Sequence, residues 1–242
     1  MQKIDSFACG FRDGVSIGLG YLSVSFAFGI IGVGSGLSVL EVVMISMLNV
    51  TSAGQLAAVP ILAKLGSLIE LVLTQVVINA RYALMSVSLS QRLDSDVRTR
   101  ERLLIGFVNT DEVFAVATSK GTMLGKKYFF GLILPPYLGW SLGTLIGAVL
   151  GNVLPELLIN ALGIALYAMF IAIVIPEGRT NKNAALCILV SVILSCAFYF
   201  LPLLKKIPSG FTVIIIAVLV SLIFALLAPV EEKCEREVSE NA

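Results

Sequence analysis

The chain has 242 residues, of which 57% are hydrophobic and only 14% are charged, and its formal net charge is +1. Soluble domains carry about 25% charged residues, so this composition indicates an integral membrane protein with the lipid bilayer as its surroundings. A near-neutral chain also lacks the basic surface that binding to nucleic acid requires.

Apolar segments that are long enough to cross a bilayer recur along the chain. A hydrocarbon core of ~30 Å needs about 20 apolar residues in a helix. We expect one membrane-embedded domain over residues 1–242, with an amphipathic lead-in over 1–13, an all-α polytopic transmembrane helix bundle, and a charged, solvated tail over 230–242. The six expected full spans are Gly14–Gly34, Leu71–Leu93, Tyr128–Gly151, Glu156–Ile175, Ala184–Leu204 and Phe211–Ala228.

Two further apolar segments carry polar residues in their middle. In Leu37–Ala63 the sequence NVTSAGQ separates two apolar halves, and in Leu103–Ser119 the sequence NTDE does the same. Each half is too short to span as a helix, and irregular backbone at membrane depth is tolerated only where protein or water covers it. We therefore expect two broken or re-entrant helices. For Leu37–Ala63, a tilted span with its polar stripe against a neighbour is the alternative.

The positions of the Lys and Arg residues test this topology, because cytoplasmic loops carry an excess of them. If every segment spans once, the Arg92–Arg102 loop lies outside, which is unfavourable. If both interrupted segments return to the side they enter from, the basic loops and both termini become cytoplasmic. The loops concerned are Arg92–Arg102, Lys120–Lys127 and Arg179–Lys182. The charges therefore favour a multi-pass protein of the cell membrane with a cytoplasmic C-terminus.

Arg81 lies in the middle of an apolar run, close to Asn79. An ionisable side chain at that depth costs about 2.5–3.5 kcal/mol on insertion scales, so it normally faces a partner or a water-filled cavity. Asp111 and Glu112, in the middle of Leu103–Ser119, are the evident counter-charges. Neighbouring residues on a helix point about 100° apart, so at most one of the two acids meets Arg81. The alternative places both acids at a helix end, as N-terminal charges that interact with its dipole.

These charges predict a site for a small zwitterion. We expect Arg81, with the polar groups of the NVTSAGQ break, to bind a carboxylate, because half-helix ends hold charged groups in transporters. Asp111 or Glu112 is expected to bind the ammonium or the coupled proton. A purely structural ion pair of Arg81 is the alternative.

Neighbouring polar and small residues complete the predicted site. Gln55 and Asn79 are expected to form its polar lining, and Gly54 is expected to leave space for a branched side chain. The predicted substrate-binding residues are Thr51, Ser52, Gly54, Gln55, Asn79, Arg81, Asp111 and Glu112.

Enzyme chemistry finds little support in the sequence. The chain has no histidine, which removes the commonest general base and most zinc sites. Asp111 is the only aspartate within an interrupted or spanning segment, and no P-loop, dinucleotide fingerprint or metal motif is present. We expect no enzyme activity, no cofactor and no metal site, with a membrane-embedded enzyme as a weaker alternative.

Several ordered patterns resemble one known family, and they extend over roughly residues 14–176. They are SAGQLA at Ser52–Ala57, Asn79–Arg81, Thr110–Glu112 followed by Phe114 and Ala115, Gly139–Thr144, and Ala168–Phe170. Together they resemble the AzlC family, the large subunits of branched-chain amino acid exporters. The family's glutamine segment usually reads Ala-Gly-x-x-Gln-Phe, whereas this chain has Ser52 and Leu56 at the glycine and phenylalanine positions. These departures leave the substrate preference open.

The resemblance implies a permease that exports valine, leucine, isoleucine or a related amino acid such as methionine. It also implies secondary transport driven by the proton gradient and a small, separately encoded hydrophobic partner of the AzlD type. The residues by themselves indicate only a polytopic protein with a buried cluster suited to a zwitterion. A channel-like or non-transporting membrane scaffold subunit is the alternative function.

Overall fold

The computed structural model describes residues 3–120, 122–151, 155, 157, 161, 164, 168, 171, 174–176, 178–179, 181–202 and 204–227. The chain forms two compact units, Met1–Phe170 and Ile171–Ala242. The expected span Glu156–Ile175 lies largely outside the described residues, and the tail over 230–242 lies entirely outside them. The single domain over 1–242 stays a prediction.

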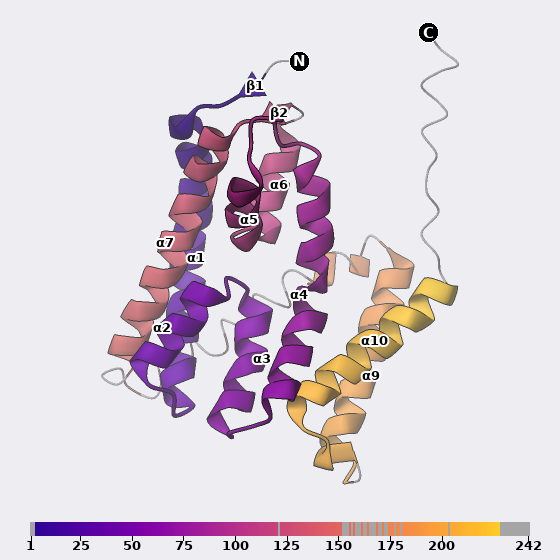
Figure 1. The fold of residues 1–242 in the computed structure, drawn as a ribbon. Helices are drawn as coiled ribbons and strands as arrows, with labels where there is room; N and C mark the ends of the chain where they lie inside the picture. Colours follow the sequence, from indigo (N-terminus) through magenta and orange to yellow (C-terminus); the bar gives the residue numbers. More distant parts are fainter. Residues whose placement is uncertain are drawn as a thin grey trace. The chain divides into compact units, whose positions relative to one another are not determined.

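Five helices in the described part of the chain are long and apolar enough to cross a membrane. They are α1 (Phe7–Gly34), α4 (Leu68–Ser90), α7 (Lys126–Leu150), α9 (Lys182–Phe200) and α10 (Ser209–Leu227) (Figure 1). The first begins earlier than expected, because the Ser6 side chain caps it by accepting the Cys9 N–H. The prediction of an all-α, polytopic membrane bundle is confirmed.

Both interrupted segments form broken helices, as predicted. The first consists of α2 (Val39–Leu48) and α3 (Ser52–Ala63), and the second of α5 (Thr99–Phe107) and α6 (Asp111–Ser119). The polar residues found in the sequence thus lie at the ends of short helices, where the backbone leaves its helical hydrogen bonding.

Side-chain caps explain where three of these half-helices begin. Ser38 and Glu41 form a reciprocal capping box at the start of α2. Glu101 accepts the backbone N–H of Arg98 at the start of α5, and the Thr110 side chain accepts the N–H of Val113 in α6. The start of α3 is different, because its N-cap residue Thr51 makes no side-chain capping bond. The positive end of the α3 dipole is therefore left uncapped by a side chain.

Each broken helix begins and ends at the same end of the first unit. In Figure 1, α5 and α6 lie in the half that carries the short strands β1 (Lys3–Ile4) and β2 (Met123–Leu124), and α2 and α3 lie in the other half. The helix α4, about 35 Å long at 1.5 Å per residue, runs between the two ends. This arrangement agrees with the re-entrant topology that the charges favour.

The two basic loops of the first unit, Arg92–Arg102 and Lys120–Lys127, meet at the end that carries the strands. The strands β1 and β2 pair in parallel, and the Lys3 amine contacts Asp94 directly and Asp96 at 3.2 Å. The hydrogen bond from Lys3 lowers the pKa of Asp94, and the same contact raises the pKa of Lys3. The Asp5 carboxylate accepts the N–H of Lys127 at 2.8 Å in the first turn of α7. The N-terminus, the α4–α5 loop and the α6–α7 loop are thereby held together.

The second unit contains a helical hairpin in its described residues. The Asn181 side chain accepts the N–H groups of Asn183 and Ala184 and so caps α9. A short 3-10 turn, Leu204–Lys206, precedes α10, which packs against α9.

Glycines let α1 and α7 approach each other closely along their length. A Cβ at Gly14 would overlap the carbonyl of Leu132, and one at Gly139 would overlap the backbone of Gly18. Small residues at such contacts allow backbone-to-backbone packing in membranes, where no hydrophobic effect drives helices together. The pair α1–α7 is therefore the tightly packed scaffold of the first unit.

This packing predicts that Gly139→Ala destabilises the protein by about 1–3 kcal/mol, as overpacking does elsewhere. The measurement is the thermal unfolding of the purified protein in detergent. Gly20→Ala on α1 is the matched control, because a Cβ there meets nothing within 4 Å. Equal melting temperatures for the two variants would contradict the prediction.

Candidate functional site

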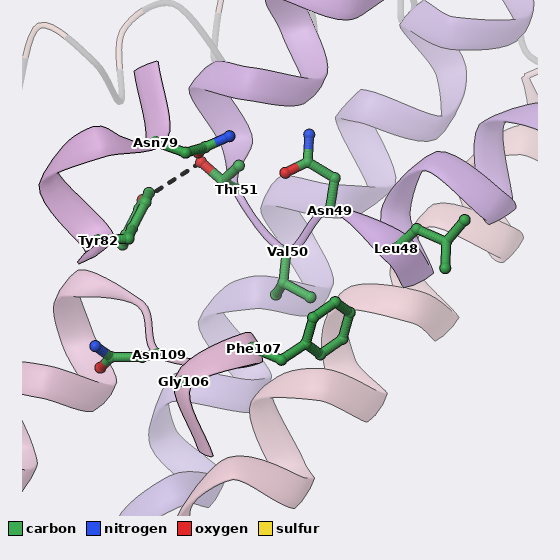
Figure 2. Close-up of a pocket in the computed structure, with 9 residues that line it drawn as sticks. All are labelled: Leu48, Asn49, Val50, Thr51, Asn79, Tyr82, Gly106, Phe107 and Asn109. Carbon is green, nitrogen blue, oxygen red and sulfur yellow. Dashed lines mark hydrogen bonds between the residues drawn. The ribbon is translucent and has the colours of Figure 1, made fainter. Parts of the chain in front are cut away.

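A pocket of about 170 Å³ lies where the two helix breaks meet α4. Its volume is below the 300–1,000 Å³ of sites for drug-sized ligands, so it fits only a small molecule. The lining residues are Leu48, Asn49, Val50 and Thr51 from the first break, Gly106, Phe107 and Asn109 from the second, and Asn79 and Tyr82 from α4 (Figure 2).

The lining divides into an apolar wall and a polar wall. In Figure 2 the side chain of Val50 lies next to the aromatic ring of Phe107, and Leu48, the third large apolar lining residue, lies farther along the end of α2. Asn79 and Tyr82 lie on the other side of the first break. The pocket therefore offers one apolar and one hydrogen-bonding surface to the same ligand.

Gln75 fastens the first break to α4. Its Oε1 accepts from Nδ2 of Asn49 at 2.9 Å and from Nδ2 of Asn79 at 3.1 Å. Its Nε2 donates to the carbonyl of Gly54 at 2.9 Å. A Cβ at Gly54 would lie 2.7 Å from Gln75 Oε1, so a side chain there would displace the Gln75 amide. The sequence analysis missed Gln75, although it lies one helical turn before Asn79 on the same face.

Two buried amide oxygens beside the pocket lack a hydrogen-bond partner in the described structure: Oδ1 of Asn79 and Oδ1 of Asn109. Asn109 is only 4% exposed, and its Nδ2 donates to Oγ of Ser86 at 3.1 Å. Leaving a buried acceptor unsatisfied costs about 1–3 kcal/mol, and native structures rarely do so. Both oxygens are thus candidate acceptors for a donor group on a ligand.

Arg81 pairs with Asp111 at the edge of this region. Two parallel contacts join the side chains, Nη1 to Oδ1 at 2.8 Å and Nη2 to Oδ2 at 2.7 Å. Nη2 also donates to Oη of Tyr82 at 2.9 Å, and Thr51 donates to the same Oη at 3.4 Å. Bidentate geometry of this kind is typical of strong Arg–carboxylate pairs. The pair links α4 to the first turn of α6, and about half of each side chain is exposed (53% and 46%).

Glu112 has a different environment from Asp111. The Tyr21 hydroxyl donates to Oε2 of Glu112 and lies 2.7 Å from Oγ1 of Thr110. Among the described residues, no Lys or Arg forms an ion pair with Glu112. The two adjacent acids are therefore separated by the fold into a paired carboxylate and an unpaired one.

Gln55 belongs to a buried hydrogen-bonded chain that joins three helices. Its Oε1 accepts from the indole Nε1 of Trp140 at 3.0 Å, and its Nε2 donates to Oγ of Ser46 at 2.6 Å. Ser46 is in turn 2.6 Å from Oγ1 of Thr144, and the Trp140 ring packs edge-on against Tyr21. Gln55 is fully buried, and in this conformation it connects α3 to α2 and α7.

The structure places the eight predicted site residues in two groups. Thr51 and Asn79 line the pocket. The other six surround it without being part of its lining, and their role in substrate binding stays a prediction: Ser52, Gly54, Gln55, Arg81, Asp111 and Glu112. Asn49, Tyr82 and Asn109 line the pocket but were not among the predicted residues. Asn49 and Asn109 belong to the polar sequences NVTSAGQ and NTDE, and this position in the breaks was the sequence feature that could have identified them.

The AzlC protein family matches residues 16–154. This range contains both helix breaks, the pocket lining, about two thirds of α1 and all of α7. The chain belongs to the AzlC family. The helices α9 and α10 follow the matched range.

Curated relatives of this AzlC protein are membrane proteins. The inner membrane protein YgaZ of Escherichia coli is 29% identical over 195 residues, which cover 78% of this chain and 79% of YgaZ. An uncharacterized membrane protein of Archaeoglobus fulgidus is 27% identical over 76% of this chain and 82% of its own length. An uncharacterized membrane protein of Helicobacter pylori is 27% identical over 83% of this chain and 90% of its own length. No solved structure matches. The predicted family and the multi-pass membrane location are confirmed.

The buried chain around Gln55 predicts that Gln55→Met destabilises the AzlC protein. The substitution keeps the size of the side chain but leaves the indole N–H of Trp140 without its acceptor, at a cost of about 1–3 kcal/mol. The measurement is again thermal unfolding in detergent. Gln91→Met is the control, because Gln91 is exposed at the C-terminal end of α4. An unchanged melting temperature for Gln55→Met would show that this network contributes nothing.

Proposed function

We propose that this AzlC protein is the permease subunit of a secondary transporter that exports branched-chain or similar small apolar amino acids across the cell membrane. The observation that carries the proposal is the pocket between the two helix breaks, with its apolar wall and its amide wall. Secondary transporters commonly place their substrate sites where discontinuous helices meet. An amino acid with an aliphatic side chain needs both kinds of wall.

The charged ends of the substrate match groups around the pocket. The free amide oxygens of Asn79 and Asn109 are acceptors for an ammonium group. The positive end of α3 beside Thr51, which no side chain caps, favours a carboxylate. Binding of the carboxylate by Arg81 requires it to exchange its present partner Asp111. Such an exchange would release the first turn of α6 from α4, so substrate binding and helix movement would be coupled.

The environments of the two acids support different roles. Asp111 is the counter-charge of Arg81. Glu112, which has no ion-pair partner in the described structure, is proposed to carry the coupled proton, with Tyr21 as its hydrogen-bond donor.

Membership of the AzlC family supports a small hydrophobic partner of the AzlD type. We therefore propose that the transporting unit contains this chain and such a subunit. The tests below use liposomes that contain both proteins.

The proposal predicts saturable exchange of labelled leucine, which Arg81→Ala should reduce at least tenfold while the protein stays folded. Arg81→Lys should recover only part of the rate, because a Lys ammonium lacks the two-point geometry of a guanidinium. Arg100→Ala, in the exposed α4–α5 region, is the control. Unselective flux that does not saturate would instead favour a channel-like subunit, and wild-type exchange by Arg81→Ala would remove Arg81 from the site.

The assignment of the coupled proton predicts that Glu112→Gln makes leucine exchange independent of pH. Asp111→Asn should lower the rate, because it weakens the ion pair with Arg81, but it should retain the pH dependence. The measurement is the initial rate of exchange at a series of pH values between about 5.5 and 8. If the pH profile survives Glu112→Gln, Glu112 does not carry the proton.

A further inference from the structure

The apolar wall of the pocket is held in place from behind by α7. The ring of Phe107 packs against the ring of Tyr137, with 6.5 Å between their centroids. The Tyr137 hydroxyl donates to the carbonyl of Met47, in the last turn of α2, at 3.3 Å. Val50, between the two half-helices, is only 8% exposed. One residue of α7 thus contacts both of the broken helices that form the wall.

Gly106 leaves open space beside this wall. A Cβ at Gly106 would meet only Oγ of Ser86, at 3.7 Å, which is an ordinary van der Waals distance. Its backbone is helical and has no positive φ, so neither a turn nor a close helix contact requires glycine there. Gly139 on α7 differs, because its missing Cβ is the condition for close packing against α1. Gly106 is a lining residue, so a methyl group at this position would lie at the wall of the pocket.

We propose that Leu48, Val50 and Phe107, together with the free space at Gly106, form the side-chain subsite of the pocket and set the largest aliphatic side chain that it accepts. This inference rests on the proposed transport function. The amide wall would then hold the polar end of the same ligand, on the other side of the first break. Because one methylene group in an apolar pocket changes selectivity about 10- to 200-fold, small changes in this wall should reorder the preferred substrates.

Two substitutions should shift the preference in opposite directions. Gly106→Ala fills space in the pocket, and alanine also favours the helix, so the variant should fold. The variant should weaken the binding of leucine and isoleucine, relative to the binding of alanine, by about tenfold or more. Phe107→Leu enlarges the pocket at a half-exposed position (47% exposed). This variant should strengthen the binding of phenylalanine and methionine relative to the binding of valine. Gly20→Ala, the same change in open space on α1, should leave the order unchanged.

The experiment compares unlabelled alanine, valine, leucine, isoleucine, methionine and phenylalanine in two assays. One is competition against labelled valine exchange in liposomes that contain the chain and its small partner. The other is the shift in melting temperature that each amino acid causes in detergent, which requires binding but no transport.

The outcomes separate this inference from the proposed function. Opposite changes of preference in Gly106→Ala and Phe107→Leu, with Gly20→Ala unchanged, are expected. If the wild type transports amino acids but both pocket variants keep its preference, the subsite is wrong and the transport function stands. If the wild type neither binds nor transports any amino acid, the proposed function is wrong and the subsite with it.

Discussion

In hydrocarbon no water satisfies the backbone groups of an interrupted helix, so a break is tolerated only where protein covers it or where it lines a water-filled cavity. Both breaks of this AzlC protein obey that constraint, because they line one pocket with α4 beside them. Gln75 supplies amide groups to the first break, and Asn109 of the second bonds to Ser86 on the same helix. The polar centre of the first unit follows from this need for cover.

The two broken helices are attached to the scaffold in different ways. The chain through Gln55, Ser46, Thr144 and Trp140 connects α2 and α3 to α7, and it contains no group that titrates near neutral pH. The first turn of α6 is held by the Arg81–Asp111 pair and by the contact of Glu112 with Tyr21. In the proposed transport cycle, a carboxylate ligand competes with Asp111 for Arg81, and Glu112 carries the coupled proton. On the proposed mechanism, the α5–α6 hairpin is therefore the element that responds, while α2 and α3 stay with the scaffold.

The scaffold itself depends on backbone contact rather than on large side chains. Glycines along α1 and α7 bring the two helices together, and this contact positions Tyr21 and Trp140 edge-to-face at 5.0 Å. Tyr21 contacts Glu112 at the second break, and Trp140 bonds to Gln55 in α3, so the two rings bring these networks into contact. The closely packed α1–α7 pair therefore holds residues of both networks, Tyr21 on α1 and Trp140 on α7, at fixed positions relative to each other.

The sequence alone determined the class of protein, the positions of both breaks and the family. These features depend on local hydropathy and on interactions within one helical turn, such as the capping box at Ser38 and the cap at Thr110. It also predicted that an acid of the Asp111–Glu112 pair is the counter-charge of Arg81, because an unpaired charge in an apolar segment is costly.

Only the tertiary structure decided which acid meets Arg81, and that Gln55 bonds to Trp140 while Gln75 joins the first break to α4. These outcomes depend on the rotation of each helix about its axis and on which helices become neighbours. Both are set by long-range packing, including the glycine contact of α1 with α7, and no pattern within a single segment contains that information.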